Sequence, residues 1–359
     1  MIITVTKPTL PDLDEYVELL EGIWRREWLT NHGPLVNELE AKLKELLGVP
    51  NTLFLSNGTI ALQIAIKALE LKGEIITTPF SYVATTSSIV WEGCKPVMVD
   101  ILPTSLTIDP EKIEAAITER TTAILATHVF GNACEISAIQ EIADKHNLKV
   151  VYDAAHAFGT QYKGKSILHY GDISTTSYHA TKLFHTVEGG GVFCEDPALL
   201  ERMALLRNFG HLSPTSFGPP GINGKNSELH AAMGLLNLKR IDSVLAKRQS
   251  VAARYDRNFA GSKLTRPVIT KGCAFNDAYY AVIFPSETDL LRTLTLLNEH
   301  GIVPRRYFYP SLSQLSYVEP FDVPVSEDIS RRVLCLPTYY TISDSEVDMI
   351  SQLVLRGQR

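Results

Sequence analysis

The chain has 359 residues, of which 45% are hydrophobic and 21% charged, and its net charge is −6. These values are typical of a globular protein, and the length suits a large domain with a smaller one. The acidic balance argues against a nucleic-acid or anionic-membrane surface, but it leaves room for a local pocket that binds an anionic small molecule.

The five cysteines are odd in number and scattered, and they form no Cys-x-x-Cys pair and no zinc-ligand spacing. We therefore expect reduced thiols and do not expect a metal site. The opening MIITVTKPTLPDL has no apolar run after a basic segment, and no run of about 18 apolar residues follows anywhere. The sequence thus predicts a cytoplasmic protein without a membrane segment.

The predicted elements start with a helix at 34–47, where Pro34 suits the first turn, leucines recur at helical spacing and Gly48 ends the helix. Short β-branched runs then alternate with amphipathic segments. Strands are expected in TLFLS, EIITTP, KPVMVD, TTAILATHV and KVVYDAA, and helices in NGTIALQIAIKALEL, around 83–92 and in EISAIQEIADKHN. This alternation predicts an α/β fold with a mostly parallel mixed sheet covered by helices.

A long helix near 226–250 is expected to join a large domain, residues 1–245, to a smaller C-terminal α+β domain, residues 246–359. In the smaller domain NDAYYAVIFP and VLCLPTYY predict strands, and ETDLLRTLTLLNEHG predicts a helix ended by Gly301.

Three polar stretches lie at or near predicted strand ends, where parallel sheets bind ligands. Asn57-Gly58-Thr59 joins a strand to a helix, which predicts either a phosphate site on free N–H groups or a simple N-cap by Thr59. The stretch matches neither a dinucleotide-binding nor a P-loop pattern. Asp153 directly follows a buried strand, so its carboxylate must be paired, with a helix N-terminus or with a protonated ring nitrogen.

Lys182 stands among hydroxyls and histidines in TTSYHATKLFHTVEGGG, just before three glycines. A desolvated lysine near other cations has a lowered pKa, and its free amine can form a Schiff base; the alternative is a lysine that reaches solvent. The glycines are expected to let the backbone approach a bulky ligand. Together, a phosphate turn, a carboxylate after a strand and such a lysine suit pyridoxal 5′-phosphate (PLP).

The sequence resembles the DegT/DnrJ/EryC1/StrS family of sugar aminotransferases over most of its length. The resemblance is carried by LTNHGPLVNELEAKL, NGTIALQIAIKAL, TTPFSYVATTSSI, KPVMVDI, THVFGNACEISAI, VVYDAAHAFG, SYHATKLFHTVEGGG and GINGKNSELHAAMGLLNL. It implies the fold type I PLP architecture, with Lys182 as the Schiff-base lysine and Asp153 at the pyridine nitrogen. It also implies a homodimer, because Asn223 matches an asparagine that reaches the phosphate in the neighbouring subunit's site.

The remaining residues implied by the resemblance contact the cofactor or the substrate. Gly58, Thr59 and Ser177 match phosphate-binding positions, and Tyr82 matches an aromatic ring stacked on the cofactor. His156 replaces a glutamine near the 3′-oxygen, which makes its role less secure. His179, His185, Glu188 and Arg305 are candidates for substrate contact, although strand-end histidines are often structural. Arg305 or Arg306 would suit a diphosphate, while RRYFYPSL as a whole would pack the small domain against the site.

The resemblance implies transfer of the amino group of L-glutamate to a nucleotide-linked 4-keto-6-deoxy sugar. Ser-Tyr-His at 177–179, Lys182 and Glu-Gly-Gly at 188–190 resemble members that act at C4, so dTDP-4-keto-6-deoxyglucose is the expected acceptor. Three alternatives remain. They are a C3 aminotransferase, a related 3-dehydratase (which would carry histidine in place of the lysine) and a PLP-binding regulator without turnover.

Overall fold

The computed structural model describes residues 2–358, and its centre is a seven-stranded sheet of order β2-β10-β9-β6-β5-β3-β4. Its strands are β2 (Asn51–Leu55), β3 (Glu74–Thr77), β4 (Lys95–Met98), β5 (Thr121–Thr127), β6 (Lys149–Asp153), β9 (Ile173–Ser177) and β10 (Gly190–Cys194). Strand β10 is antiparallel to both of its neighbours, and the other pairs are parallel. The predicted α/β fold with a mostly parallel mixed sheet is confirmed.

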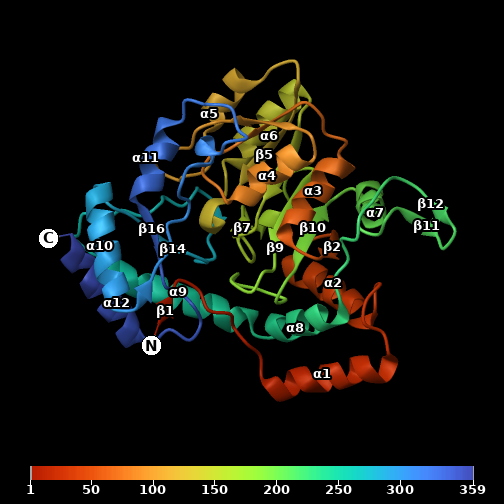
Figure 1. Cartoon of the computed structure of the whole chain (residues 1–359), viewed down its shortest axis with the longest axis horizontal. Helices are drawn as coiled ribbons and strands as arrows, with labels where there is room; N and C mark the ends of the chain where they lie inside the picture. The colour runs from red at the N-terminus through yellow and green to blue at the C-terminus, as the bar shows by residue number, and fades with distance from the viewer. Residues whose placement is uncertain (1, 359) are drawn as a thin grey trace.

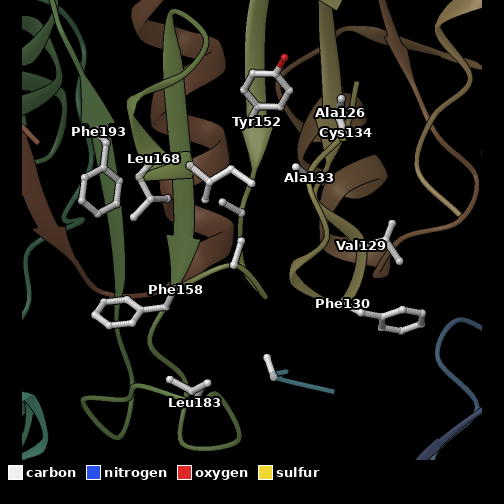
Figure 2. Close-up of a cluster of buried hydrophobic side chains, with 14 of the residues drawn as sticks. Ala126, Val129, Phe130, Ala133, Cys134, Tyr152, Phe158, Leu168, Leu183 and Phe193 are labelled. Atoms are coloured by element: carbon white, nitrogen blue, oxygen red, sulfur yellow. The ribbon is translucent and has the colours of Figure 1, made fainter. Parts of the chain in front are cut away.

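Successive side chains of a strand point to opposite faces of the sheet, and here both faces are apolar. Helices cover each face, which gives two separate apolar cores. Phe193, Tyr152 and Ala126 face one core, part of which is shown in Figure 2. The first core is completed mainly by α1 (Leu13–Arg26), α2 (Pro34–Leu47), α5 (Pro110–Ile113), α6 (Ile136–His146) and α8 (Glu228–Leu238), and the second by α3 (Gly58–Ala68), α4 (Val83–Trp91) and α7 (Pro197–Leu206).

The predicted helix at 34–47 is α2. Its leucines are buried on one face, and Gly48 ends it with a φ of 59°, the left-handed conformation that glycine adopts without strain. The helix after the Asn57-Gly58 turn is α3, but its N-cap is Asn57 and not Thr59: the Asn57 side chain accepts a hydrogen bond from Ile60 N at 2.9 Å. The Thr59 hydroxyl is therefore not used to begin the helix.

A third core lies in the C-terminal part of the chain. It contains side chains of α9 (Ile241–Asn258), β14 (Tyr280–Ile283), α10 (Glu287–Glu299), β15 (Ile302–Val303), β16 (Val333–Leu336) and α12 (Asp344–Gly357). Strand β1 (Ile3–Thr4) pairs in parallel with β15, and Ile3 is buried in this same core. Figure 1 shows the two chain ends lying in this region. The expected boundary at 245/246 falls inside α9.

The single long helix expected near 226–250 is wrong, since the structure has two helices, α8 and α9, that are separated at Lys239 and Arg240. Arg240 N donates to Asn237 O, a tighter turn than the α-helix makes, and Arg240 itself has a φ of −109° and a ψ of 0°. The two helices differ in burial. Helix α8 is buried along most of its length, whereas α9 buries only one side, and the apolar residues Val251, Ala252 and Tyr255 on that side belong to the third core.

The remaining elements are short. They are β7 (Gln161–Tyr162), β8 (Lys165–Ser166), β11 (His211–Ser213), β12 (Ser216–Phe217), β13 (Cys273–Ala274) and α11 (Pro324–Arg332). Strands β11 and β12 form a hairpin that projects from the molecule at the side opposite the C-terminal core (Figure 1).

Candidate active site

The carboxyl ends of three adjacent parallel strands form the floor of a cavity. Thr127 of β5, Asp153 of β6 and Thr175 of β9 are cross-strand neighbours, and all three line it. Ten of the residues singled out from the sequence also line this cavity: Gly58, Thr59, Tyr82, Asp153, His156, Ser177, His179, Lys182, Glu188 and Arg305. Segments separated by more than 240 residues of sequence thus meet at one edge of the sheet.

Asp153 is buried at the end of β6 and is held by two hydrogen bonds. Its Oδ2 accepts from Thr85 Oγ1 at 2.7 Å and its Oδ1 accepts from Ala155 N at 3.1 Å. Burial raises the pKa of this carboxyl, while the two hydrogen bonds and the nearby Lys182 oppose the rise. Asp153 also lines the cavity, and no lysine or arginine among residues 2–358 forms an ion pair with it. Its carboxylate can therefore accept a hydrogen bond from a protonated nitrogen of a ligand.

Lys182 lies in the loop after β9, and its amine has the chemistry the sequence predicted. Burial lowers its pKa from 10.5 to about 8; Asp153 opposes this effect and Arg305 adds to it. A substantial fraction of the amine is thus neutral near physiological pH, and a neutral amine can attack a carbonyl or accept a proton. A lysine reaching freely into solvent would not show this shift.

The start of α3 offers an anion site in the wall of the same cavity. Gly58 and Thr59 occupy the first turn, whose N–H groups have no partner within a helix. A Cβ at Gly58 would lie 2.9 Å from Ser177 Cβ, so glycine is needed for the turn to sit against Ser177. Backbone N–H groups and the Ser177 hydroxyl together make a cradle that fits a phosphate group.

His156 and Tyr82 also line the cavity. His156 is buried against the rings of Tyr279 and Phe308, with ring centroids 4.4 Å and 5.7 Å away, and its Nδ1 has no hydrogen-bond partner in the described chain. Burial holds the pKa of His156 well below its usual value, so the ring is neutral. An unpartnered nitrogen in a cavity wall fits a polar ligand atom. Tyr82 is 55% exposed and offers an open ring face.

Of the candidates for substrate contact, three line the cavity. His179 and Glu188 lie side by side, with Nε2 and Oε1 3.6 Å apart, and Arg305 enters from the C-terminal part of the chain. Arg306 points elsewhere, to Glu287. His185 is buried outside the cavity and its Nε2 bonds to the Thr9 carbonyl. Asn223 does not line this chain's own cavity; it forms an isolated bridge with Asn208 near the β11–β12 hairpin.

The three glycines after Lys182 do not make room for a ligand, so that expectation is wrong. A Cβ at Gly190 would lie 2.4 Å from the Asn57 carbonyl group, and one at Gly191 would lie 2.6 Å from the Tyr178 hydroxyl. A Cβ at Gly189 would meet Thr186 Oγ1 at 2.1 Å. The glycines let β10 pack tightly against protein, and this packing fixes the phosphate turn and the lysine loop on either side.

Several residues that build the site were missed from the sequence. Thr85 bonds Asp153, and Ser81 Oγ lies 2.7 Å from Thr85 Oγ1 and 3.0 Å from Thr127 Oγ1, which extends the chain of hydroxyls. The available signal was the unusual density of hydroxyl residues in SYVATTSS at the start of a helix that is otherwise apolar. Tyr307 and Phe308 also line the cavity, where packing alone was expected.

Among residues 2–358 no group of three or more His, Cys, Asp or Glu side chains is arranged to hold a metal ion. No helix in the described range is both long and apolar enough to cross a bilayer.

This fold and cavity define a PLP-binding enzyme of the aminotransferase class, and comparisons with known proteins agree. Residues 12–355 match the DegT/DnrJ/EryC1/StrS aminotransferase family. The dTDP-4-amino-4,6-dideoxy-D-glucose transaminases of Shigella dysenteriae and Escherichia coli are 43% and 38% identical to the chain, covering 97% and 98% of both proteins. The chain therefore belongs to this family and is a sugar aminotransferase.

Solved structures show the same architecture. The crystal structure of DesI with its TDP-sugar product superposes with a TM-score of 0.94 at 31% identity, covering 100% of this chain and 93% of that one. The PMP form of the sugar aminotransferase Spr1654 from Streptococcus pneumoniae has a TM-score of 0.91 at 25% identity, covering 98% of each chain. Together with the family match, these neighbours confirm the resemblance seen in the sequence and imply PLP as the cofactor.

Proposed function

We propose that this protein transfers the amino group of L-glutamate to the C4 ketone of dTDP-4-keto-6-deoxyglucose. The observation that carries the proposal is the shared cavity of Lys182 and Asp153, in which the lysine pKa is lowered to about 8. The relatives from Shigella dysenteriae and Escherichia coli are named for the amino sugar that such a reaction would produce.

In this proposal PLP is attached to Lys182 and, when bound, supplies an electron sink for the loss of a proton from the amino-bearing carbon. Once displaced by the amino donor, the Lys182 amine takes that proton on Nζ and returns it to a neighbouring carbon. Asp153 would hold a proton on the ring nitrogen, because its buried carboxylate lines the cavity and each oxygen can accept a second hydrogen bond beside the one it receives from the chain. Lys182 thus acts as nucleophile and as general acid and base in turn.

The other cavity residues hold the cofactor in place. Gly58, Thr59 and Ser177 bind the phosphate through the cradle at the start of α3. Tyr82 would offer its aromatic face to the ring, and the unpartnered Nδ1 of neutral His156 would bond the 3′-oxygen. These roles follow from the fit of the residues to a phosphorylated pyridine and from the family's pattern.

Amination at C4 rests on the residues around the lysine. His179 and Glu188 line the cavity as a pair, and Ser-Tyr-His before Lys182 with Glu-Gly-Gly after it resembles the members that act at C4. A small shift of the sugar against a fixed cofactor decides which ketone reacts. NMR of the product tests this: an amino group on C3 would identify the alternative C3 enzyme.

We also propose a homodimer in which each subunit completes its partner's site. Asn223 does not line its own cavity, and it lies beside a projecting hairpin on which Leu212 and Phe217 are about three-fifths exposed. Subunits that carry only Asn223→Ala should therefore complement subunits that carry only Lys182→Ala. Mixing the two inactive variants should restore part of the activity, while no recovery despite proven subunit exchange would contradict a shared site.

The test of the function as a whole is incubation of the purified holoenzyme with L-glutamate and a panel of dTDP-, UDP- and GDP-linked keto sugars. The visible absorbance of the bound cofactor should fall on addition of L-glutamate and return on addition of the dTDP-linked 4-keto sugar. Mass analysis should then find the amino sugar. A regulator without turnover would bind the cofactor but show no such cycle. We place the enzyme in the cytoplasm, because all five cysteines are free thiols.

A further inference from the structure

Arg305 is a cation without a carboxylate partner at the wall of the active-site cavity. It lines the cavity with Lys182, and no Asp or Glu among residues 2–358 lies within ion-pair distance of it. The next residue makes a useful contrast. Arg306 bonds Glu287 Oε1 and the Arg331 carbonyl, both at 2.9 Å, and lies over the ring of Tyr309.

The backbone and one aromatic ring hold Arg305 in position. Arg305 N donates to the Cys335 carbonyl at 3.2 Å, and Cys335 N donates to the Arg305 carbonyl at 2.8 Å. Cys335 belongs to the buried strand β16, so this anchor is rigid. The guanidinium carbon lies 5.1 Å from the centroid of the Tyr307 ring. An arginine against a ring keeps the N–H donors at its edge available for a bidentate anion.

We propose that Arg305 binds the α-carboxylate of the amino donor, an inference that rests on the proposed aminotransferase function. The carbon that gives up its proton to Lys182 carries the amino group and the carboxylate on adjacent bonds. Wherever that carbon reacts, its carboxylate must therefore lie close to the Lys182 amine. Among the described residues, Arg305 is the only arginine or lysine besides Lys182 that this chain contributes to the lining of its own cavity.

Two further observations favour this carboxylate over the sugar diphosphate. Arg305 and Lys182 line the same cavity, and the positive charge of Arg305 helps to lower the pKa of the Lys182 amine. The diphosphate of the acceptor is attached at C1 and is separated from the reacting C4 by the width of the sugar ring. A cation close to the reacting nitrogen is therefore placed for the donor carboxylate, which is one bond from the reacting carbon.

The experiment compares Arg305→Gln and Arg305→Lys with the matched control Arg306→Gln, all as holoenzymes. Three ligands that cannot turn over are titrated: 2-methyl-L-glutamate, 2-methylalanine and dTDP. The two amines lack an α-hydrogen, so they can displace Lys182 without losing a proton, and the shift in cofactor absorbance gives their Kd. Binding of dTDP is followed by calorimetry, and thermal unfolding shows that each variant is folded.

We expect Arg305→Gln to weaken both amines by the same factor, ~10-fold or more, which corresponds to about 1.4 kcal/mol. Arg305→Lys should recover part of this loss, and dTDP binding and the Arg306→Gln control should match the wild type. Weakening of 2-methyl-L-glutamate alone would assign Arg305 to the side-chain carboxylate, and weakening of dTDP alone would assign it to the diphosphate; either result overturns the proposal.

The proposed function and the role of Arg305 fail in different ways. If the wild-type holoenzyme shows no absorbance change with either amine, the aminotransferase function itself is contradicted, and the role of Arg305 with it. If the wild type responds and Arg305→Gln responds equally well, only the role of Arg305 is overturned.

Discussion

The two ends of the cavity are built in different ways. The end that contains Asp153, Gly58 and Ser177 consists of strand ends and a helix start, fixed by sheet register and by side-chain hydrogen bonds. The end that contains Arg305 and Tyr307 comes from the C-terminal part of the chain and carries a cation without a partner. The difference suggests that the first end holds a resident group rigidly, while the second exchanges ligands.

Removal of the lysine amine should give the largest effect and would test whether the rigid end carries the chemistry. Lys182→Ala should lower turnover by ~10³-fold or more, since both the covalent anchor and the general acid-base group are lost. The fold should survive, because Lys182 is not part of an apolar core. Steady-state kinetics and thermal unfolding check this, with the exposed Lys165→Ala as control. Near-normal turnover of Lys182→Ala would contradict the mechanism.

The next effect in size concerns the carboxylate at the same end. Asp153→Asn should lower turnover by ~10²-fold, because an amide cannot hold a proton on the ring nitrogen. Thr85→Val keeps the carboxylate but removes its 2.7 Å hydrogen bond, so a smaller loss of ~10-fold is expected. Turnover and cofactor content of the two variants separate chemistry from binding. Equal losses in both would show that Asp153 acts mainly as a structural cap.

The pH dependence connects the two ends. Only the neutral Lys182 amine can react, so capture of PLP by the apoenzyme should speed up with pH until about 8 and level off above it. Well below that pH the rate should change about tenfold per unit. Burial and Arg305 lower this pKa and Asp153 raises it, so Arg305→Gln should move the midpoint upward and Asp153→Asn downward. Stopped-flow absorbance gives both midpoints, and an unmoved midpoint in Arg305→Gln would mean that the two ends are not coupled.

The smallest effect is expected at the exposed pair of His179 and Glu188. The atoms are 3.6 Å apart and both side chains are about half exposed, so the pair itself contributes little stability. Glu188→Gln should raise KM for the nucleotide sugar ~3-fold with little change for L-glutamate, the size of one lost exposed contact. Initial rates with each substrate varied in turn measure this. A larger rise in KM for L-glutamate than for the nucleotide sugar would assign Glu188 to the binding site of the amino donor.

The rigid end of the cavity could be predicted from the sequence because its signals are local. A strand followed by Asn57-Gly58-Thr59 and a strand followed by Asp153 each place a polar group at the end of a parallel strand, and such ends share one edge of the sheet. The family resemblance supplied the order of the remaining motifs. The comparisons confirmed the family and the fold, and the roles of the individual cavity residues stay predictions.

The other features depend on tertiary contacts that a sequence pattern does not encode. Thr85 bonds Asp153 across 68 residues, and nothing in a run of threonines specifies which one turns toward the carboxylate. Arg305 and Arg306 are adjacent and chemically equal, yet only the position of Glu287 decides which of them is left free. The glycines after Lys182 signalled a close approach, but whether to a ligand or to protein depended on where Asn57 and Tyr178 lie.

The pairing of β1 with β15 has a consequence for synthesis on the ribosome. Residues 3–4 leave the ribosome long before residues 302–303, which form their partner strand. At about 5–20 residues per second this delay is roughly 15–60 s. The strand ends and the helix start that form the rigid end of the cavity are all encoded before residue 195, whereas Arg305 comes only two residues after β15. A nascent chain can therefore assemble the proposed cofactor site well before it acquires Arg305, the cation proposed to bind the donor.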